Sequence, residues 1–228
     1  MRALRILLIV AVVLGGALVG IDRLAVSYAE SEASSRVKLS ASTSDSIEVD
    51  IKGFPFLTQV ADKRFDEVDV KATGVRATAG DKDVRVGELT ATLRDVTVTG
   101  DWAGAKAGSA SGTALISYAD LTAASDREAT VAYGGNGKVK VTGSVKVLGR
   151  SLTRSVISTV TVVNGDTIKV RADEVPGAGI PGVEELVRAR TDFERPLGMI
   201  AGMKVEKVEP RPDGLAVIVT GKDVVLAG

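Results

Sequence analysis

Pairs of carboxylates are the side chains of this sequence from which a hydrolytic or calcium-binding centre could be built. They occur at Asp81/Asp83, Asp173-Glu174 and Glu184-Glu185. None has the spacing of an EF-hand calcium loop, and none lies in a motif that would position a glycosidase-type acid and base. Ser35 and Lys38 fit a Ser-x-x-Lys nucleophile pattern, but its Ser-Asp-Asn and Lys-Thr-Gly companions are missing from the sequence. We interpret the carboxylates as solvated surface groups.

The composition narrows the possible functions further. The 228 residues include no Cys and no His, which removes disulfides, thiolate metal sites and the commonest general base. Lys and Arg number 29 against 29 Asp and Glu, so no overall positive field attracts nucleic acid. Hydrophobic residues make up 45% of the chain, enough for the core of one domain. The composition indicates a folded protein and argues against catalysis without forbidding it, since an enzyme would need carboxylates, Lys or a cofactor; we expect no enzyme, no cofactor and no metal.

The N-terminus predicts export from the cytoplasm. Arg2 and Arg5 precede an uncharged apolar stretch from Ile6 to Ile21, which ends at Asp22-Arg23. As a helix this stretch is about 24 Å long, slightly shorter than the roughly 30 Å hydrocarbon core of a bilayer. Positive residues ahead of it place the N-terminus inside and the domain outside. We expect an uncleaved single-pass anchor in the cell membrane.

The alternative is a cleaved signal peptide, because small residues precede a possible cleavage site after Ala29, which would release a secreted protein. The predicted organisation is a signal-anchor segment over residues 1–23 and an extracytoplasmic domain over residues 24–228. A helix is expected from Arg23 to about Leu39, and its apolar stripe is weak. It is either a stalk that lifts the domain from the membrane or the first helix of the domain.

The rest of the chain alternates apolar and polar residues with a period of two, which is typical of half-buried β-strands. Asn164-Gly165 separates two such runs and predicts a type I′ hairpin turn. Short helices are expected at Ser117–Ser125 and Val183–Asp192, and the Gly-rich residues 103–112 form either a loop or a thin strand. The pattern predicts an α+β fold; a closed β-sandwich would give nearly the same alternation.

Two of the four Phe residues lie in one run, Gly53-Phe54-Pro55-Phe56-Leu57. Pro and Gly stiffen and bend the backbone there, so two large apolar groups are held at a turn. Such a turn either fills the protein's own core or contacts something apolar outside it. We expect Phe54, Phe56 and Leu57, together with the single Trp at position 102, to contact lipid or membrane.

Five cations lie in the only long segment without acidic residues, between Glu128 and Asp166. Those on the predicted strand share one face, opposite its valines, because side chains alternate along a strand. Either this is an ordinary solvated strand face or the cations hold an anionic headgroup. The candidate headgroup residues are Lys138, Lys140, Lys146, Arg150 and Arg154.

Two motifs carry a resemblance to a known family. Gly53-Phe54-Pro55-Phe56-Leu57-Thr58-Gln59, with Phe65-Asp66-Glu67-Val68-Asp69-Val70 after it, resembles the opening motif of the LmeA-like phospholipid-binding proteins of actinobacteria. The segment from Gly202 to Leu226 is similar to that family's closing motif. The resemblance implies an envelope protein without a catalytic centre that holds or presents an anionic phospholipid, such as a phosphoinositide, during cell-envelope glycolipid assembly.

The resemblance also suggests an architecture, in which a long curved antiparallel sheet wraps around one or two helices and leaves an apolar groove. This is similar to the tubular fold of bactericidal permeability-increasing proteins. Two other functions stay open on the sequence. One is a structural β-domain that binds another protein on the outer face of the membrane and has a filled core. The other is a hydrolase with converging carboxylates.

Overall fold

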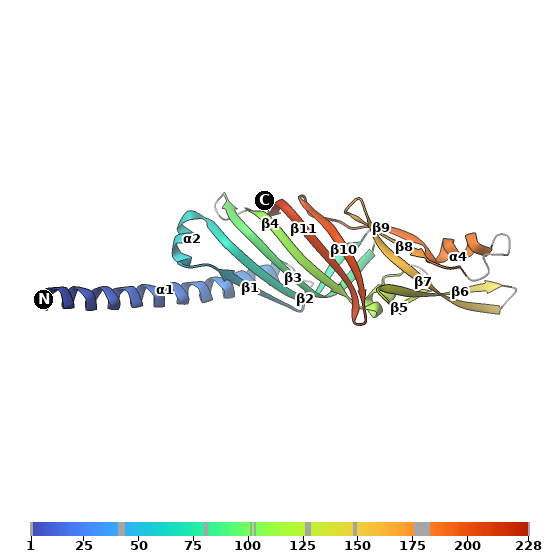
Figure 1. Ribbon diagram of the computed structural model, residues 1–228, viewed down its shortest axis with the longest axis horizontal. Helices are drawn as coiled ribbons and strands as arrows, with labels where there is room; N and C mark the ends of the chain where they lie inside the picture. The colour runs from blue at the N-terminus through green and yellow to red at the C-terminus, as the bar shows by residue number, and fades with distance from the viewer. Residues whose placement is uncertain are drawn as a thin grey trace.

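The computed structural model describes residues 2–40, 44–79, 82–100, 102, 104–125, 129–147, 150–175 and 183–227. The molecule is elongated (Figure 1). Helix α1 (Arg2–Ser40) projects from one end, a first sheet forms the middle, and a second sheet forms the other end. The predicted α+β class is confirmed, with the strands divided between two antiparallel sheets.

The first sheet, sheet A, has six strands in the order β1-β2-β3-β4-β11-β10. Their bounds are β1 Ser46–Lys52, β2 Arg64–Ala79, β3 Lys82–Thr99, β4 Gly104–Ile116, β10 Met203–Arg211 and β11 Gly214–Ala227. Strand β4 shows that the Gly-rich segment is a thin strand rather than a loop. A Cβ added at Gly112 would lie 2.7 Å from the Thr90 carbonyl oxygen of β3, so only glycine fits there.

The second sheet, sheet B, has five strands in the order β5-β6-β7-β8-β9. Their bounds are β5 Ala129–Gly135, β6 Lys138–Val147, β7 Arg150–Val163, β8 Thr167–Ala172 and β9 Phe193–Pro196. The predicted type I′ turn joins β7 to β8. Asn164 and Gly165 have φ of 55° and 76°, and the Asp166 N–H donates to the Val163 carbonyl at 3.3 Å.

Three short helices accompany the sheets: α2 (Phe56–Asp62), α3 (Tyr118–Ala123) and α4 (Val183–Thr191). The sequence predicted α3 and α4. The side chain of Ser117 caps α3 by accepting a hydrogen bond from the Asp120 N–H at 3.1 Å. Helix α2 was not predicted, because it is short and begins inside the Phe-Pro-Phe run.

Helix α1 covers the free edge of sheet A. The edge strand β1 directs two backbone donors away from its partner β2. The Ile51 N–H donates to Glu30 Oε1 at 2.8 Å, and the Val49 N–H donates to Ser34 Oγ at 3.2 Å. Side chains of α1 thus satisfy backbone groups that a sheet edge would otherwise leave unpaired.

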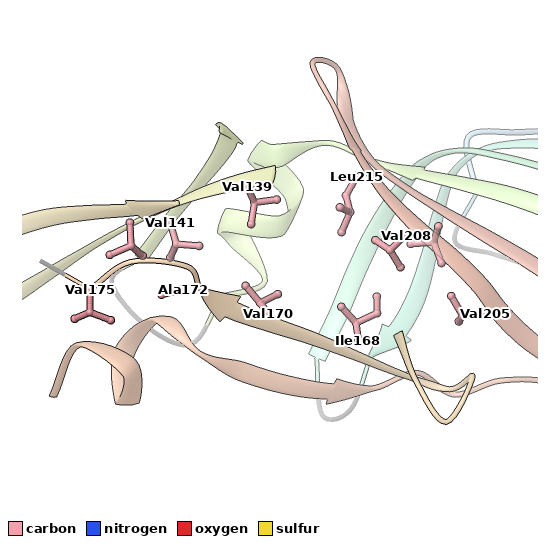
Figure 2. Packing of buried hydrophobic residues seen from close by; sticks show 11 residues of the cluster. Val139, Val141, Ile168, Val170, Ala172, Val175, Val205, Val208 and Leu215 are labelled. Atoms are coloured by element: carbon pink, nitrogen blue, oxygen red, sulfur yellow. The ribbon is translucent and has the colours of Figure 1, made fainter. Parts of the chain in front are cut away.

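The buried apolar residues form two clusters. The anchor-side cluster lies where α1 meets sheet A, and its members are Val26, Phe56, Phe65, Val96, Ala107, Ala110 and Val224. The intersheet cluster joins sheet B to strands β10 and β11 of sheet A. Figure 2 shows its side chains from β6, β8, β10 and β11 turned toward the space between the two sheets.

One backbone hydrogen bond joins the two sheets at this junction, and a second, within sheet B, holds the turn that accepts the first. The Val205 N–H of β10 donates to the Gly165 carbonyl in the β7–β8 turn at 2.6 Å. The Leu197 N–H, just after β9, donates to the Asp166 carbonyl at 2.7 Å. The edge of sheet A is therefore tied to the turn that ends β7, and the apolar faces of the two sheets meet at a fixed position.

Candidate functional site

An apolar cavity of about 420 Å³ lies between the two sheets. Sheet A supplies residues from β2, β3, β4 and β11, sheet B supplies residues from all five of its strands, and α3 closes one side. Representative lining residues are Val86, Ile116, Val131, Val139, Ile168 and Leu215. The volume falls within the roughly 300–1,000 Å³ of small-molecule sites, which are likewise mostly apolar.

Strand alternation explains why the cavity is lined by apolar groups. Val139 and Val141 of β6 are each 2% exposed and face the cavity, whereas Lys140 between them is exposed on the other face. On β8 Ile168 and Val170 face inward in the same way. Figure 2 shows Val139, Val170 and Ile168 on the side of the cluster nearest to Leu215 and Val208 of sheet A. The two sheets thus enclose a space that favours hydrocarbon over water.

One charged side chain, that of Arg195 on β9, lies among the described residues that line the cavity. Its neighbour Phe193 also lines it and is 38% exposed. Strand β9 pairs only with β8, so these two residues lie at the outer edge of sheet B. The cavity is therefore apolar inside and carries a cation where it reaches the sheet edge.

The residues of the Phe-Pro-Phe motif lie at the opposite end, beside α1. Phe56 is 4% exposed and belongs to the anchor-side cluster, with its ring centroid 6.2 Å from that of Phe65. Phe65 in turn lies 6.4 Å from the ring of Trp102. Phe56 therefore fills the core, as one of the two interpretations of this motif proposed.

The other members of the motif point outward. Phe54 is 54% exposed, Leu57 is 43% exposed and Trp102 is 54% exposed. The Arg23 guanidinium lies 5.4 Å from the Phe54 ring centroid, within cation–π range, so this apolar surface continues onto α1. We call Phe54, Leu57 and Trp102 the collar. Their contact with a membrane stays a prediction.

Of the five predicted headgroup cations, the structure describes the side chains of three, and these three do not share one face of sheet B. Lys138 and Lys140 share the outer face of sheet B, and Lys138 Nζ is 2.7 Å from Asp173 Oδ2. Arg154 pairs with Gly143 and is exposed on the opposite face of the sheet. The side chains of Lys146 and Arg150 lie outside the described residues. None of the described cations of this group lines the cavity, and their headgroup role stays a prediction.

Two of the candidate carboxylates, Asp173 and Glu184, make ordinary ion pairs. Hydrogen bonds from Lys138 and Thr159 lower the pKa of Asp173 below its usual value. Glu184 accepts a hydrogen bond from Arg188 at 2.9 Å within α4. Asp81 lies outside the described residues. Among the residues that the structure describes, no group of three carboxylates is placed to hold a metal ion.

A wider hollow of about 590 Å³ lies on the polar face of sheet A. Hydroxyls and carboxylates line it, among them Glu48, Asp69, Thr92, Thr113 and Thr220. Although it is larger than the intersheet cavity, it is more open to solvent and offers a ligand much less apolar surface than that cavity does. We therefore take the intersheet cavity as the candidate site.

Sequence reasoning missed the cavity lining, including Phe193, Arg195 and Met199. Alternation identified the valines of β6 and β8 as inward-facing, but it cannot tell an inward face that meets a filled core from one that meets a cavity. Strand β9 is only four residues long and was not predicted. In the sequence, the one indication that Arg195 belongs to an apolar site is its position close to Leu197 and Met199.

Helix α1 contains a segment, Val12–Ser35, that is long and apolar enough to cross a membrane. Its first half is exposed, and its packing against the domain begins at Asp22 and Val26, which are 3% and 8% exposed. An N-terminal helix of this kind is compatible with either a membrane anchor or a signal sequence.

Comparison with known proteins agrees with this site. The family model described as "LmeA-like phospholipid-binding" matches residues 20–220. No curated protein and no solved structure matches the chain. The matched region runs from the start of the α1 contact with the domain into β11 and includes the whole intersheet cavity. The chain therefore belongs to the LmeA-like phospholipid-binding family.

Proposed function

We propose that this protein is a membrane-anchored, extracytoplasmic carrier that holds the acyl portion of an anionic phospholipid in the intersheet cavity. The observation that carries the proposal is the cavity itself, about 420 Å³ of apolar space between two sheets in a member of a phospholipid-binding family. A scaffolding domain would fill this space with side chains.

The driving force for binding is the transfer of methylene groups out of water. Each buried methylene contributes about 0.8 kcal/mol, so burying about ten contributes roughly 8 kcal/mol before the loss of chain freedom is subtracted. The lining offers valine, leucine and isoleucine side chains rather than fixed polar partners. Such a surface accepts acyl chains of differing length, so the headgroup provides the selectivity.

We propose that α1 stays attached as the anchor. Cleavage after Ala29 would remove Val26 from the anchor-side cluster and Asp22 from its hydrogen bond to the Leu57 N–H. Both residues are buried, so the cleaved chain would lose part of its core. Packing begins at Asp22, one residue before the predicted boundary at residue 23.

Helix α2 lies beside the part of α1 that leaves the domain (Figure 1). Two collar residues contact α1: Phe54 lies against Arg23, and the Leu57 N–H donates to Asp22. We propose that Phe54, Leu57 and Trp102 rest in the interfacial layer of the membrane in which α1 is anchored. Aromatic side chains favour that layer because one end of the ring system is apolar and the other tolerates water.

Two finer assignments rest on the family resemblance. One is the identity of the lipid as a phosphoinositide, and the other is a role in glycolipid assembly of the envelope; both stay predictions. The outer-face lysines Lys138 and Lys140 are turned away from the cavity. We therefore propose for them only an interaction with an anionic surface outside the protein, not with a lipid held inside it.

The proposal is tested by native mass spectrometry of the full chain released from nanodiscs, combined with lipid extraction. We expect a phospholipid bound at close to one per chain. A lipid-free protein that also takes up no phospholipid from the nanodisc would contradict the carrier function and favour the scaffolding domain. A variant with a larger side chain in the cavity, Ala114→Phe, provides the control and should bind less phospholipid.

A further inference from the structure

We propose that Arg195 is the headgroup-binding residue of the intersheet cavity and that it selects lipids carrying a phosphate. This inference rests on the proposed carrier function and deepens it. It does not depend on the predicted surface cations, because none of those whose side chains the structure describes lines the cavity.

The strand register fixes the direction of the Arg195 side chain. Residues directly opposite each other in an antiparallel pair project from the same face of the sheet. Arg195 is paired with Ile168, and Phe193 is paired with Val170. Ile168 and Val170 are buried in the cavity lining, so Arg195 and Phe193 project toward the cavity as well.

The residue between them supports this assignment. Glu194 is paired with Lys169, and their side chains form an ion pair on the outer face of sheet B. The two charged residues of β9 thus project from opposite faces of the sheet. Glu194 therefore lies on the outer face, and Arg195 projects from the face that lines the cavity.

The position of Arg195 suits a headgroup rather than an acyl chain. Strand β9 is the last strand of sheet B, and Arg195 is only half-buried there. A long side chain at such an edge lays its methylenes on the apolar lining and keeps its guanidinium near water. A lipid whose acyl chains enter between the sheets would leave its phosphate at this edge. The planar guanidinium can donate two parallel hydrogen bonds to phosphate oxygens.

The test compares two lipids with the same acyl chains, phosphatidic acid and diacylglycerol, which differ by the phosphate. Both are added at equal mole fraction to the full chain in micelles of dodecyl maltoside, a detergent that carries no phosphate, and the occupancy of each is measured by native mass spectrometry. The variants are Arg195→Gln, Arg195→Lys and the control Arg171→Gln. Arg171 lies on the neighbouring strand β8 but is exposed on the outer face.

A hydrogen-bonded charge pair contributes about 1.5–3 kcal/mol, equivalent to about 10- to 100-fold in affinity. We expect Arg195→Gln to lower the ratio of bound phosphatidic acid to bound diacylglycerol by about this factor, with diacylglycerol occupancy unchanged. Arg195→Lys should lower the ratio less, because the charge is kept and the planar fork is lost. Arg171→Gln should leave the ratio unchanged.

Two outcomes would overturn the assignment of Arg195. In one, Arg195→Gln lowers both occupancies equally, which would mean a structural role. In the other, it changes neither. In a further experiment, inorganic phosphate is added at the concentration of phosphatidic acid. If it displaces phosphatidic acid, the site binds the free anion, and the proposal is also overturned. If neither lipid binds the unmodified chain, the carrier function itself fails, which is distinguishable from a failure at Arg195.

Discussion

Asp22 Oδ1 in α1 accepts a hydrogen bond from the backbone N–H of Leu57 at 2.9 Å. Leu57 lies in the first turn of α2, where backbone donors have no partner inside the helix. The N-cap residue of α2 is Pro55, which supplies no side-chain cap. A carboxylate from the anchoring helix therefore caps the helix of the Phe-Pro-Phe motif and links α1 to the collar.

We expect Asp22→Ala to remove this hydrogen bond and to destabilise the start of α2. Without the carboxylate the Leu57 donor has no acceptor, and the loss of a charge-assisted hydrogen bond costs about 1.5–3 kcal/mol. Hydrogen exchange of the Leu57 amide in the full chain should accelerate by about 10- to 100-fold. The control is Asp62→Ala at the exposed end of α2. Unchanged exchange at Leu57 in the Asp22 variant would show that the cap does not stabilise α2.

Filling the cavity should displace the lipid. Ala114 of β4 lines the cavity, and Ala114→Phe would place a ring in space that is empty of protein atoms. We expect phospholipid occupancy in native mass spectra to fall by about tenfold, with the thermal unfolding midpoint changed little. Ala132→Phe is the matched control, because Ala132 follows the lining residue Val131 and projects from the other face of β5. Equal loss in both variants would argue against the cavity as the binding site.

The collar can be tested through the single Trp of the chain. In vesicles containing brominated phospholipids we expect the fluorescence of Trp102 to be quenched, because bromine quenches only within contact distance of the lipid region. Phe54→Asp together with Leu57→Asp should lower this quenching, since two charges are then placed in the interfacial layer. Ile157→Asp, at an exposed apolar position on sheet B, is the control and should have no effect. A Trp102 signal that brominated lipid does not quench would rule out the membrane contact.

Phe56→Asp should behave differently from its neighbours. Phe56 is 4% exposed, and removing a buried Phe side chain costs about 3–5 kcal/mol even without the added charge. We expect the variant to unfold at much lower denaturant concentration, whereas Phe54→Asp keeps the midpoint of the unmodified chain. Equal stability of the two variants would contradict the buried position of Phe56.

Acid should lower the stability of the folded protein through Glu209 on strand β10. Hydrogen bonds from Lys207 and then Arg211 lower the pKa of Glu209 to about 2. Because this value lies below that of the unfolded chain, about 4.3, the folded state holds fewer protons between the two. The stabilisation is therefore complete above pH 4.5 and disappears as the pH falls toward 2. Thermal unfolding of Glu209→Gln should differ from the unmodified chain at pH 6 and converge with it near pH 2; a constant difference across this range would contradict the shift.

Much of the fold was predictable because strands and turns leave local signals. Asn164-Gly165 specified its turn through backbone preference, and Lys138, Val139 and Lys140 showed which face of β6 is buried. The site was harder to predict because it depends on distance between sheets. Whether Val139 meets another side chain or an empty space is decided by strands β4 and β11, which are far away in the sequence.

The Phe-Pro-Phe motif shows a second limit of sequence reasoning. Core filling and external contact were treated as alternatives, yet the motif divides between them. Phe56 begins a helical turn and points into the protein, whereas Phe54 precedes Pro55 and points outward. This division arises because α2 begins at Phe56, between the two rings. The helix has only seven residues, so its composition gives no clear signal of where it starts.

The hydrogen bonds from β1 to Glu30 and Ser34 have a consequence for the behaviour of the protein outside its membrane. A chain deprived of α1 would present the Val49 and Ile51 donors to solvent on a regular strand, and such a strand recruits the matching strand of another molecule. Helix α1 therefore also keeps the edge of sheet A from pairing with the same edge of another copy. We expect proteolytic loss of α1 to make the remaining chain prone to polymerise.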